Sequence, residues 1–195
     1  MSKTADPISR FSNWLEEAKS CKEIAEPTAM CLATVGEGGK PSARMVLLKA
    51  ADENGFVFYT NNESRKGGEL KANPHVALCF YWMPLERQVR VEGRAQPVSD
   101  AEADAYFASR GRESRIGAWA SKQSRPLSGK AELLKAVAAE GLRFNIGEVP
   151  RPPYWSGWRV VPEVIEFWQA GTARLHDRDA YTRSSQGWNI HKLYP

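Results

Sequence analysis

The spacing of apolar residues near the start of the chain predicts an amphipathic helix. Phe11, Trp14, Leu15 and Ala18 fall on one face of a helix over residues 7–20, because side chains three or four positions apart are neighbours on a helix. An apolar face of this kind needs a partner, so we expect the helix to pack on the main body of the protein.

From residue 28 onward the pattern changes to short, strand-like segments. Five segments rich in β-branched, aromatic and other apolar residues are typical of strands, and they cover residues 28–35, 42–50, 56–60, 75–82 and 88–97. The segments between them carry turn residues, and Asn54-Gly55 is a strong hairpin signal.

Two helical segments interrupt the strands, at residues 99–109 and 129–144, and aromatic, strand-like segments follow the proline-rich residues 149–153. Ser99 followed by Glu102 is a capping-box signature for the first of these helices. Many short strands with tight turns and inserted helices predict a mainly β protein with helical additions, built as an antiparallel barrel. We divide the chain into an N-terminal helical segment, 1–26, and a barrel domain, 27–195.

Composition narrows the class of protein. The 195 residues fit one domain, and no apolar run approaches the ~20 residues that a membrane helix needs. Three widely spaced cysteines and a polar N-terminus predict a reduced, cytoplasmic protein without a disulfide framework or metal site. The net charge of +4 is spread over pairs of basic residues inside apolar strings, which favours local anion sites over a nucleic-acid surface.

The densest ionisable chemistry lies near the C-terminus. Arg174, Leu175, His176, Asp177 and Arg178 place two guanidiniums, an imidazole and a carboxylate within five residues. If this segment is extended, the two arginines and the histidine share one face and suit an anionic, planar ligand. The alternative is a solvated edge strand whose charges discourage aggregation.

Two further strings combine cations with strand ends. On an alternating strand, Arg44 and Lys49 face opposite sides and would serve different ligands, although a buried strand with solvated charged ends has the same pattern. Thr60 ends a strand, and Arg65 and Lys66 open a helix whose first N–H groups, together with these cations, can hold a phosphate.

Three other segments offer donors to a ligand. Gln88 can both donate to and accept from the imide-like edge of a flavin, or can lie on an exposed strand face. Tyr106, Arg110 and Ser114 are spaced four apart, so a continuous helix would present them along one side to a phosphate monoester, or to solvent. The alternative is a helix interrupted at Gly111. Residues 121–126 form a polar loop with amide, hydroxyl and cationic donors, which alone is also consistent with a linker.

Taken together, these strings resemble the pyridoxine/pyridoxamine 5′-phosphate oxidase family. The resemblance runs in unbroken order from about residue 27 to residue 195, and is carried by RMVLLK (44–49), FYTN (58–61), SRK (64–66), LERQVRVEG (85–93), SRIGAWASKQS (114–124), GEVPRPPYWSGWRV (147–160), IEFWQ (165–169) and RLHDR (174–178). The sequence contains no serine elbow, Walker loop or dinucleotide glycine motif, which excludes the corresponding hydrolase, nucleotide triphosphatase and Rossmann classes.

The resemblance implies an FMN-binding split β-barrel that forms a homodimer with FMN at the subunit interface. It implies that FMN is bound by Arg44, Met45, Val46, Leu47, Leu48, Lys49, Tyr59, Thr60, Arg65, Lys66, Gln88, Gln123, Ser124, Trp168 and Arg178. It implies that the substrate is bound by Lys49, Tyr106, Arg110, Ser114, Arg174, Leu175 and His176, with Arg174 and His176 as the catalytic pair.

The activity implied by the resemblance is oxidation of pyridoxine 5′-phosphate and pyridoxamine 5′-phosphate to pyridoxal 5′-phosphate, by hydride transfer from C4′ to FMN with O₂ as the final acceptor. The alternative is a split-barrel flavin protein that acts as a carrier, a sensor or a reductase of another substrate. The presence of a complete substrate set beside the flavin set favours the oxidase.

Overall fold

One long strand, β7 (Trp155–Gln169), organises the sheet in this computed structural model, which describes residues 6–195. Along its 15 residues β7 pairs with three antiparallel neighbours, β4 (Gly55–Asn61), β6 (Arg87–Pro97) and β8 (Asp177–Ser184). The strand order is β2-β1-β5-β6-β7-β4-β3, and β9 (Gly187–Lys192) extends the sheet from β8. The other strands are β1 (Ala29–Val35), β2 (Pro41–Leu47), β3 (Ala50–Asp52) and β5 (His75–Trp82).

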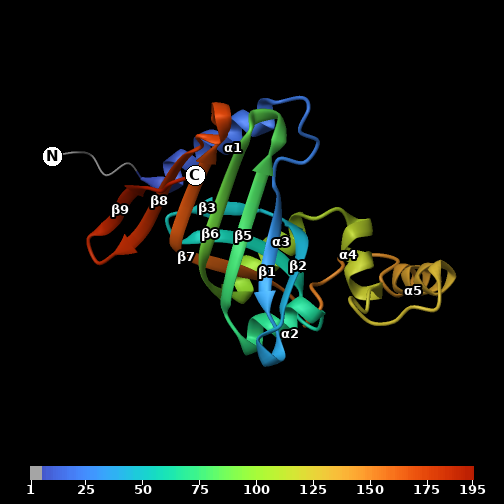
Figure 1. Cartoon of the computed structure of the whole chain (residues 1–195). Helices are drawn as coiled ribbons and strands as arrows, with labels where there is room; N and C mark the ends of the chain where they lie inside the picture. The colour runs from blue at the N-terminus through green and yellow to red at the C-terminus, as the bar shows by residue number, and fades with distance from the viewer. Residues whose placement is uncertain (1–5) are drawn as a thin grey trace.

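A bulge in β6 lets the sheet curl into the half-barrel seen in Figure 1. The register with β7 shifts between Glu92 and Gly93, and such bulges bend a strand and increase its twist. A Cβ on Gly93 would lie 2.1 Å from the carbonyl oxygen of Val161, so the close approach of the two backbones at this bend requires glycine.

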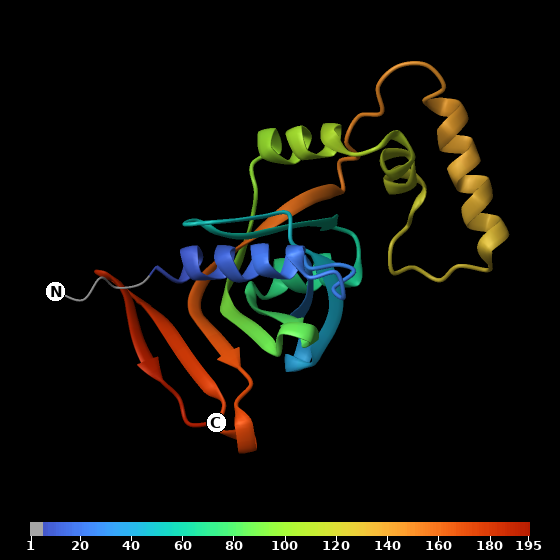
Figure 2. The ribbon, with the colours of Figure 1, turned by 90° about the horizontal axis from the view of Figure 1, so that it is seen from above.

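Helix α1 (Pro7–Ser20) packs into the core of the half-barrel, which confirms the N-terminal helix expected from the apolar spacing. Asp6 caps the helix by accepting hydrogen bonds from the backbone N–H groups of Ile8 and Ser9. The Phe11 ring is fully buried, with its centroid 4.9 Å from that of Phe56 and 5.0 Å from that of Phe80. Figure 2 shows the helix lying across the curled sheet.

Four further helices connect the strands: α2 (Arg65–Ala72), α3 (Asp100–Ser109), α4 (Arg112–Ala120) and α5 (Lys130–Arg143). Short 3₁₀ turns lie at η1 (Glu37–Gly39), η2 (Met83–Leu85) and η3 (Thr172–Arg174). Helices α4 and α5 pack on each other and project from the sheet (Figures 1 and 2). Arg112 joins them, because its guanidinium donates to the carbonyl oxygens of Phe144 and Gly147 just beyond α5.

The expected helices and strands are confirmed with small differences at their ends. The strand expected over 42–50 is divided, because β2 ends at Leu47 and β3 begins at Ala50. At the start of α3, Ser99 Oγ accepts from the N–H of Glu102 at 3.1 Å. The Glu102 carboxylate binds the Arg159 guanidinium across the sheet, so only half of the expected capping box forms.

The prediction that residues 174–178 form one extended segment is wrong. Ala173 and Arg174 have φ values of 55° and 64° within the turn η3, and strand β8 begins only at Asp177. The turn is closed by hydrogen bonds from Leu175 N to Thr172 O and from His176 N to Arg174 O. These contacts take Arg174 and His176 out of the strand alternation that would have aligned them with Arg178.

None of the helices in the described part of the chain, residues 6–195, is long and apolar enough to cross a membrane.

Candidate active site

A cavity of about 720 Å³ opens beside strands β2 and β4 and helices α2, α3 and α4. Its volume falls in the range of small-molecule sites. Residues that are far apart in the sequence meet here, and the predicted site residues among the lining are Met45, Val46, Leu47, Lys49, Tyr59, Thr60, Lys66, Tyr106, Arg110, Ser114 and Gln123. We call these eleven residues the cavity set.

A stack of aromatic rings forms a flat part of the cavity wall. The Tyr59 ring lies 4.0 Å from Tyr106 and 5.2 Å from Trp155, with interplanar angles of 13° and 8°. The stack needs glycine at position 157, because a Cβ there would lie 2.7 Å from the Tyr59 ring. Burial raises the pKa of Tyr59 to about 12, so the phenol stays neutral at physiological pH.

Arg110 is the clearest anion-binding group in the cavity. Its guanidinium lies 4.9 Å from the Trp155 ring centroid, and its Nη1 is buried without a hydrogen-bond partner among residues 6–195. Burial lowers the pKa of the guanidinium. A buried donor without a partner destabilises the protein unless a ligand supplies an acceptor, so this atom indicates a place for an anion.

A continuous helix through Tyr106, Arg110 and Ser114 does not form, in agreement with the helix end expected at residue 109 and with an interruption at Gly111. Helix α3 ends at Ser109, Arg110 adopts an extended conformation, and α4 begins at Arg112 after Gly111. All three predicted side chains nevertheless line the cavity, because the break turns α4 back toward it.

A second cation enters the cavity from the start of α2. Ser64 caps this helix by accepting from the N–H of Gly67, as its position before the two cations suggests. Lys66 Nζ donates to Thr60 Oγ1 at 3.1 Å and to Gln123 Oε1 at 2.7 Å. Burial and the nearby Arg44 lower the pKa of the Lys66 ammonium, and a bound anion would favour its charged form.

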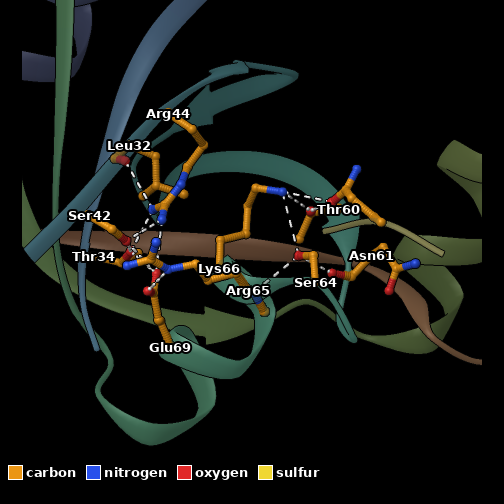
Figure 3. A network of polar contacts seen from close by, with 12 residues as sticks. Leu32, Thr34, Ser42, Arg44, Thr60, Asn61, Ser64, Arg65, Lys66 and Glu69 are labelled. Carbon is orange, nitrogen blue, oxygen red and sulfur yellow. Dashed lines mark hydrogen bonds and ion pairs between the residues drawn. The ribbon is translucent and has the colours of Figure 1, made fainter. Parts of the chain in front are cut away.

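Behind Lys66, the buried carboxylate of Glu69 holds two arginines (Figure 3). Its Oε2 lies 2.9 Å from Arg44 Nη2, and its Oε1 lies 2.8 Å from Arg65 Nε. Burial alone would raise the pKa of this carboxyl, but its hydrogen bonds outweigh burial and lower the pKa to about 2. Arg44 and Arg65 therefore adjoin the cavity without lining it.

The remaining predicted residues gather at the other end of the sheet. Gln88 lies opposite Trp168 in the register of β6 with β7, and Trp168 lies opposite Arg178 in the register of β7 with β8. We call this group the C-terminal set, and its members are Gln88, Trp168, Arg174, Leu175, His176 and Arg178.

Within the C-terminal set, the imidazole and one guanidinium have defined partners. The His176 ring lies 4.7 Å from the Trp168 ring, and its Nδ1 accepts from the N–H of Gly171 at 3.2 Å. The neutral imidazole therefore carries its proton on Nε2. Arg178 Nε donates to the buried carboxylate of Glu166 at 2.8 Å, whereas Arg174 and Leu175 are exposed.

The two sets do not meet within one chain. Figure 2 shows the β8–β9 hairpin and helix α4 at opposite ends of the molecule, and no member of the C-terminal set lines the cavity. Of the other predicted residues, Ser124 follows Gln123 in a loop with φ of 69°. Leu48 lines a separate cavity of about 220 Å³, to which Lys49 also contributes.

Sequence reasoning missed several residues of the site. The cavity is also lined by Asn61, Gly111, Gly117, Ala118, Ser121 and Trp155. Asn61 and Trp155 lie inside segments that carry the family resemblance, so the resemblance could have identified them as site residues. Glu69 lies four residues after Arg65 on the same helix, a spacing at which opposite charges pair.

Beside the cavity, the outer face of β1, β2 and β5 exposes large apolar side chains. Met45 is 62% exposed, Tyr81 is 59% exposed and Leu47 is 38% exposed. The partly exposed Cys31 lies between β2 and β5 on this face, directly opposite Met45 and Cys79. Apolar patches of this kind are typical of interaction surfaces.

Comparison with known sequences places nearly the whole chain in one family. A family model described as pyridoxamine 5′-phosphate oxidase matches residues 16–143, and one described as the pyridoxine 5′-phosphate oxidase C-terminal dimerisation region matches residues 155–195. The chain is 62% identical over 195 residues to a pyridoxine/pyridoxamine 5′-phosphate oxidase of Rhodospirillum rubrum, covering 97% of this chain and 96% of that protein. It is 58% identical over 190 residues to the enzyme of that name from Myxococcus xanthus, covering 97% and 92%.

Solved structures share the fold. PhzG from Burkholderia lata, in complex with tetrahydrophenazine-1-carboxylic acid, superposes with a TM-score of 0.91 at 31% identity, covering 100% of this chain and 95% of that one. A pyridoxamine 5′-phosphate oxidase-related, FMN binding protein from Nostoc punctiforme gives a TM-score of 0.75 at 16% identity, covering 96% of each chain. The split-barrel fold expected from the sequence is confirmed, and the chain belongs to the pyridoxamine 5′-phosphate oxidase family.

Proposed function

We propose that this protein oxidises pyridoxine 5′-phosphate and pyridoxamine 5′-phosphate to pyridoxal 5′-phosphate with FMN as its cofactor. The observation that carries the proposal is a cavity lined by three cations, Lys49, Lys66 and Arg110, beside a flat aromatic wall, in which Lys66 and Arg110 supply two separate anion-binding groups. Two anion-binding groups suit a pair of ligands that each carry a phosphate. A bound FMN would supply the acceptor for a hydride from C4′ of the substrate, with O₂ as the final oxidant and H₂O₂ as its product. For the amine substrate, water would hydrolyse the resulting imine to the aldehyde with release of ammonia.

The residues of this chain fit FMN. The partly buried Lys66 ammonium, with Gln123 and Thr60 around it, lies at the start of α2, where helix N–H groups and cations favour a phosphate. We assign the flavin to Met45, Val46, Leu47, Leu48, Lys49, Tyr59, Thr60, Lys66, Gln123 and Ser124 of one chain, with Arg65 beside them at the flavin phosphate and Arg44 behind.

We assign the substrate phosphate to the second anion-binding group of the cavity, Arg110. The unpartnered Nη1 of Arg110 supplies a buried donor, and Lys49, Tyr106 and Ser114 line the same cavity. A phosphate monoester carries about −1.5 to −2 charges at neutral pH, so it supplies the acceptors that this guanidinium lacks.

We propose that the active protein is a homodimer in which a second copy supplies the C-terminal set. Residues 155–195 match a region described as a dimerisation region, and the apolar outer face of β1, β2 and β5 adjoins the cavity through Met45 and Leu47. In such a dimer Gln88, Trp168 and Arg178 complete the flavin site, and Arg174, Leu175 and His176 complete the substrate site.

The chemistry of the chain's own residues is mainly positioning. Arg174 carries a fixed charge and no acceptor, so we assign it to covering and orienting the substrate ring. His176, which presents Nε2–H because Gly171 N–H occupies Nδ1, can donate a hydrogen bond to the oxygen or nitrogen attached to C4′ and so orient it, and the proton lost from that atom passes to water. Good orientation lowers a barrier by about 7–11 kcal/mol in well-aligned intramolecular reactions, so phosphate anchoring outweighs any single acid or base.

The alternative is a flavin protein acting on another ligand, as the phenazine compound in the PhzG structure illustrates. The cationic substrate groups favour a phosphorylated substrate, and the chain is 62% identical to an oxidase of the phosphorylated vitamers but 31% identical to PhzG. We also propose a cytoplasmic location, because Cys21, Cys31 and Cys79 are all free thiols and such thiols persist in reducing compartments.

Anaerobic mixing of the FMN-loaded protein with each phosphorylated vitamer tests the proposed reaction. We expect the flavin absorbance near its visible maximum to bleach within the mixing period and to return when O₂ is admitted, with release of H₂O₂. The unphosphorylated vitamers are the control and should bleach the flavin far more slowly. A flavin that stays oxidised with both phosphorylated vitamers contradicts the proposed reaction.

A further inference from the structure

We propose that Glu69 is a positioning residue of the flavin phosphate site: it orients Arg65 toward the phosphate and balances the charge of Arg44 behind it. The proposal rests on the proposed function, because it concerns the phosphate of FMN. Glu69 itself faces the barrel and is not among the cavity-lining residues.

The contacts of Glu69 fill both oxygens of its carboxylate. Oε2 accepts from Thr34 Oγ1 at 2.6 Å, from Ser42 Oγ at 2.7 Å and from Arg44 Nη2 at 2.9 Å. Oε1 accepts from Arg65 Nε at 2.8 Å. Because these donors come from β1, β2 and α2, the carboxylate joins the start of α2 to the edge of the sheet (Figure 3).

The two arginines that contact Glu69 differ in how many of their N–H groups have an acceptor in the protein. Arg65 is held through Nε alone, its two Nη atoms make no hydrogen bond to any residue of 6–195, and its side chain is 65% exposed. A guanidinium fixed in this way presents a preorganised fork to a phosphate. Arg44 instead donates through Nη1 to Leu32 O and Thr34 Oγ1, and through Nη2 to Ser42 Oγ and Glu69, so both of its Nη atoms already have acceptors in the protein.

The charges around Lys66 are also set by Glu69. Arg44 and Arg65 both contact Glu69, and Lys66 lies near them. The pKa of the Lys66 ammonium is lowered first by burial and then by the nearby Arg44, whereas Glu69 raises it. One carboxylate among them leaves two net positive charges, which match the near-dianion of a phosphate monoester at neutral pH. Without it, the cations would repel one another before the ligand arrives.

A purely structural role makes a different prediction. If Glu69 only joined α2 to the sheet, its loss would disturb the whole flavin site, and it would weaken binding of FMN and of riboflavin, which has no phosphate, to a similar extent. If Glu69 positions the phosphate ligands, its loss weakens FMN binding alone.

The experiment measures dissociation constants of FMN and riboflavin by flavin fluorescence quenching, using full-length apoprotein and its Glu69→Gln variant. We expect the Kd for FMN to rise by about tenfold or more, as for the loss of charge-assisted hydrogen bonds, and the Kd for riboflavin to stay within about twofold. The matched control is Asp179→Asn, another buried carboxylate held by an arginine, Arg10, but outside the cavity. It should leave the ratio of the two constants unchanged.

A double-mutant cycle tests whether Glu69 acts through Arg65. We expect Arg65→Ala to weaken FMN binding, and Glu69→Gln to add less in that background than in the wild type. Full additivity of the two effects overturns the assignment to Arg65. If Glu69→Gln does not fold, Ser42→Ala, which removes one donor to Oε2, should give a smaller loss that is again confined to FMN.

The outcomes separate this inference from the function it rests on. Wild-type protein that binds FMN no more tightly than riboflavin overturns both. Wild-type protein with a clear preference for FMN, together with Glu69→Gln or Ser42→Ala effects that are equal for the two flavins, leaves the cofactor assignment intact and overturns the role of Glu69.

Discussion

The cavity set and the C-terminal set differ in how far one chain prepares them for a ligand. In the cavity set, Lys66 donates to Thr60 and Gln123, and the Tyr59 ring stacks on the rings of Tyr106 and Trp155. In the C-terminal set, Arg174 lies exposed in a turn with positive φ, and Leu175 is 74% exposed. One group is preorganised by the fold, and the other lies on the surface.

This difference assigns different tasks to the two ends of the molecule. Preorganised donors bind a ligand at low entropic cost, which suits retention of a cofactor. Exposed groups on a turn become ordered only when another surface covers them, which suits a contribution across a dimer interface. Both ends hold an arginine against a buried glutamate, Glu69 with Arg65 and Glu166 with Arg178, so each end orients one guanidinium before assembly.

Subunit complementation makes the sharpest test of this comparison. We expect Arg110→Ala and Arg174→Ala homodimers to be nearly inactive, and a purified heterodimer of the two variants to recover about half of the wild-type activity. The reason is that a two-fold dimer with shared sites would combine both wild-type sets in one site and both variants in the other. Activity is measured on tandem-tagged heterodimers after removal of both homodimers.

The matched control is a heterodimer of Arg110→Ala with Lys49→Ala, two variants in the same cavity set. Each of its sites carries one defect, so it should stay as inactive as the homodimers. A heterodimer of Arg110→Ala and Arg174→Ala that also stays inactive contradicts the division of the site between two chains.

Single substitutions in the two sets should affect different steps. Arg174→Ala should lower kcat by about 100-fold through loss of substrate orientation, with the Kd for FMN within about twofold of wild type. Lys66→Ala should raise the Kd for FMN by about tenfold, because a partly buried cation at the start of α2 is lost. Steady-state kinetics at saturating FMN and flavin titration of the apoprotein measure the two effects, and equal turnover in Arg174→Ala would remove it from the reacting face.

Much of the structure around the cavity could be predicted from the sequence, because neighbouring residues determine where its helices and strands begin and end. The sequence predicts that Arg65 and Lys66 open a helix after the strand that ends near Thr60, and the structure has that helix. The strand patterns place Tyr59 and Thr60 at the end of β4. Long-range pairs such as Glu69 with Arg44 have no signal of this kind, because they depend on how α2 meets the sheet.

The C-terminal end resisted prediction for a different physical reason. Alternation of charges over residues 174–178 predicts a strand, but the close approach of Gly171 to Leu175 closes a turn there. A Cβ on Gly171 would lie 1.9 Å from Leu175 O, so one glycine decides the local path and outweighs the side-chain pattern. The resemblance to the family gave the residues of this set but not their placement in space.

The pH dependence of the free energy of unfolding should also differ between substitutions at the cavity end and at the C-terminal end, but by a smaller amount. The pKa of Glu69 is lowered to about 2 in the folded protein from an ordinary value of 4.5, so the unfolded state binds more protons between those values. The stability contributed by this carboxylate is therefore complete above about pH 4.5 and is lost as the pH falls toward 2. Arg174, exposed at the other end, takes no part in this balance.

We expect Glu69→Gln to lower the free energy of unfolding at pH 7 by about 3–5 kcal/mol, as for a buried ion pair that loses one partner. The difference from wild type should shrink as the pH falls from 4.5 toward 2, because the wild-type carboxyl becomes neutral as well. Urea unfolding followed by tryptophan fluorescence at several pH values measures both curves, with Arg174→Ala as the control that should parallel wild type throughout. A difference that stays constant across this range would mean that the charge of Glu69 contributes nothing, and that only the shape of its side chain stabilises the start of α2.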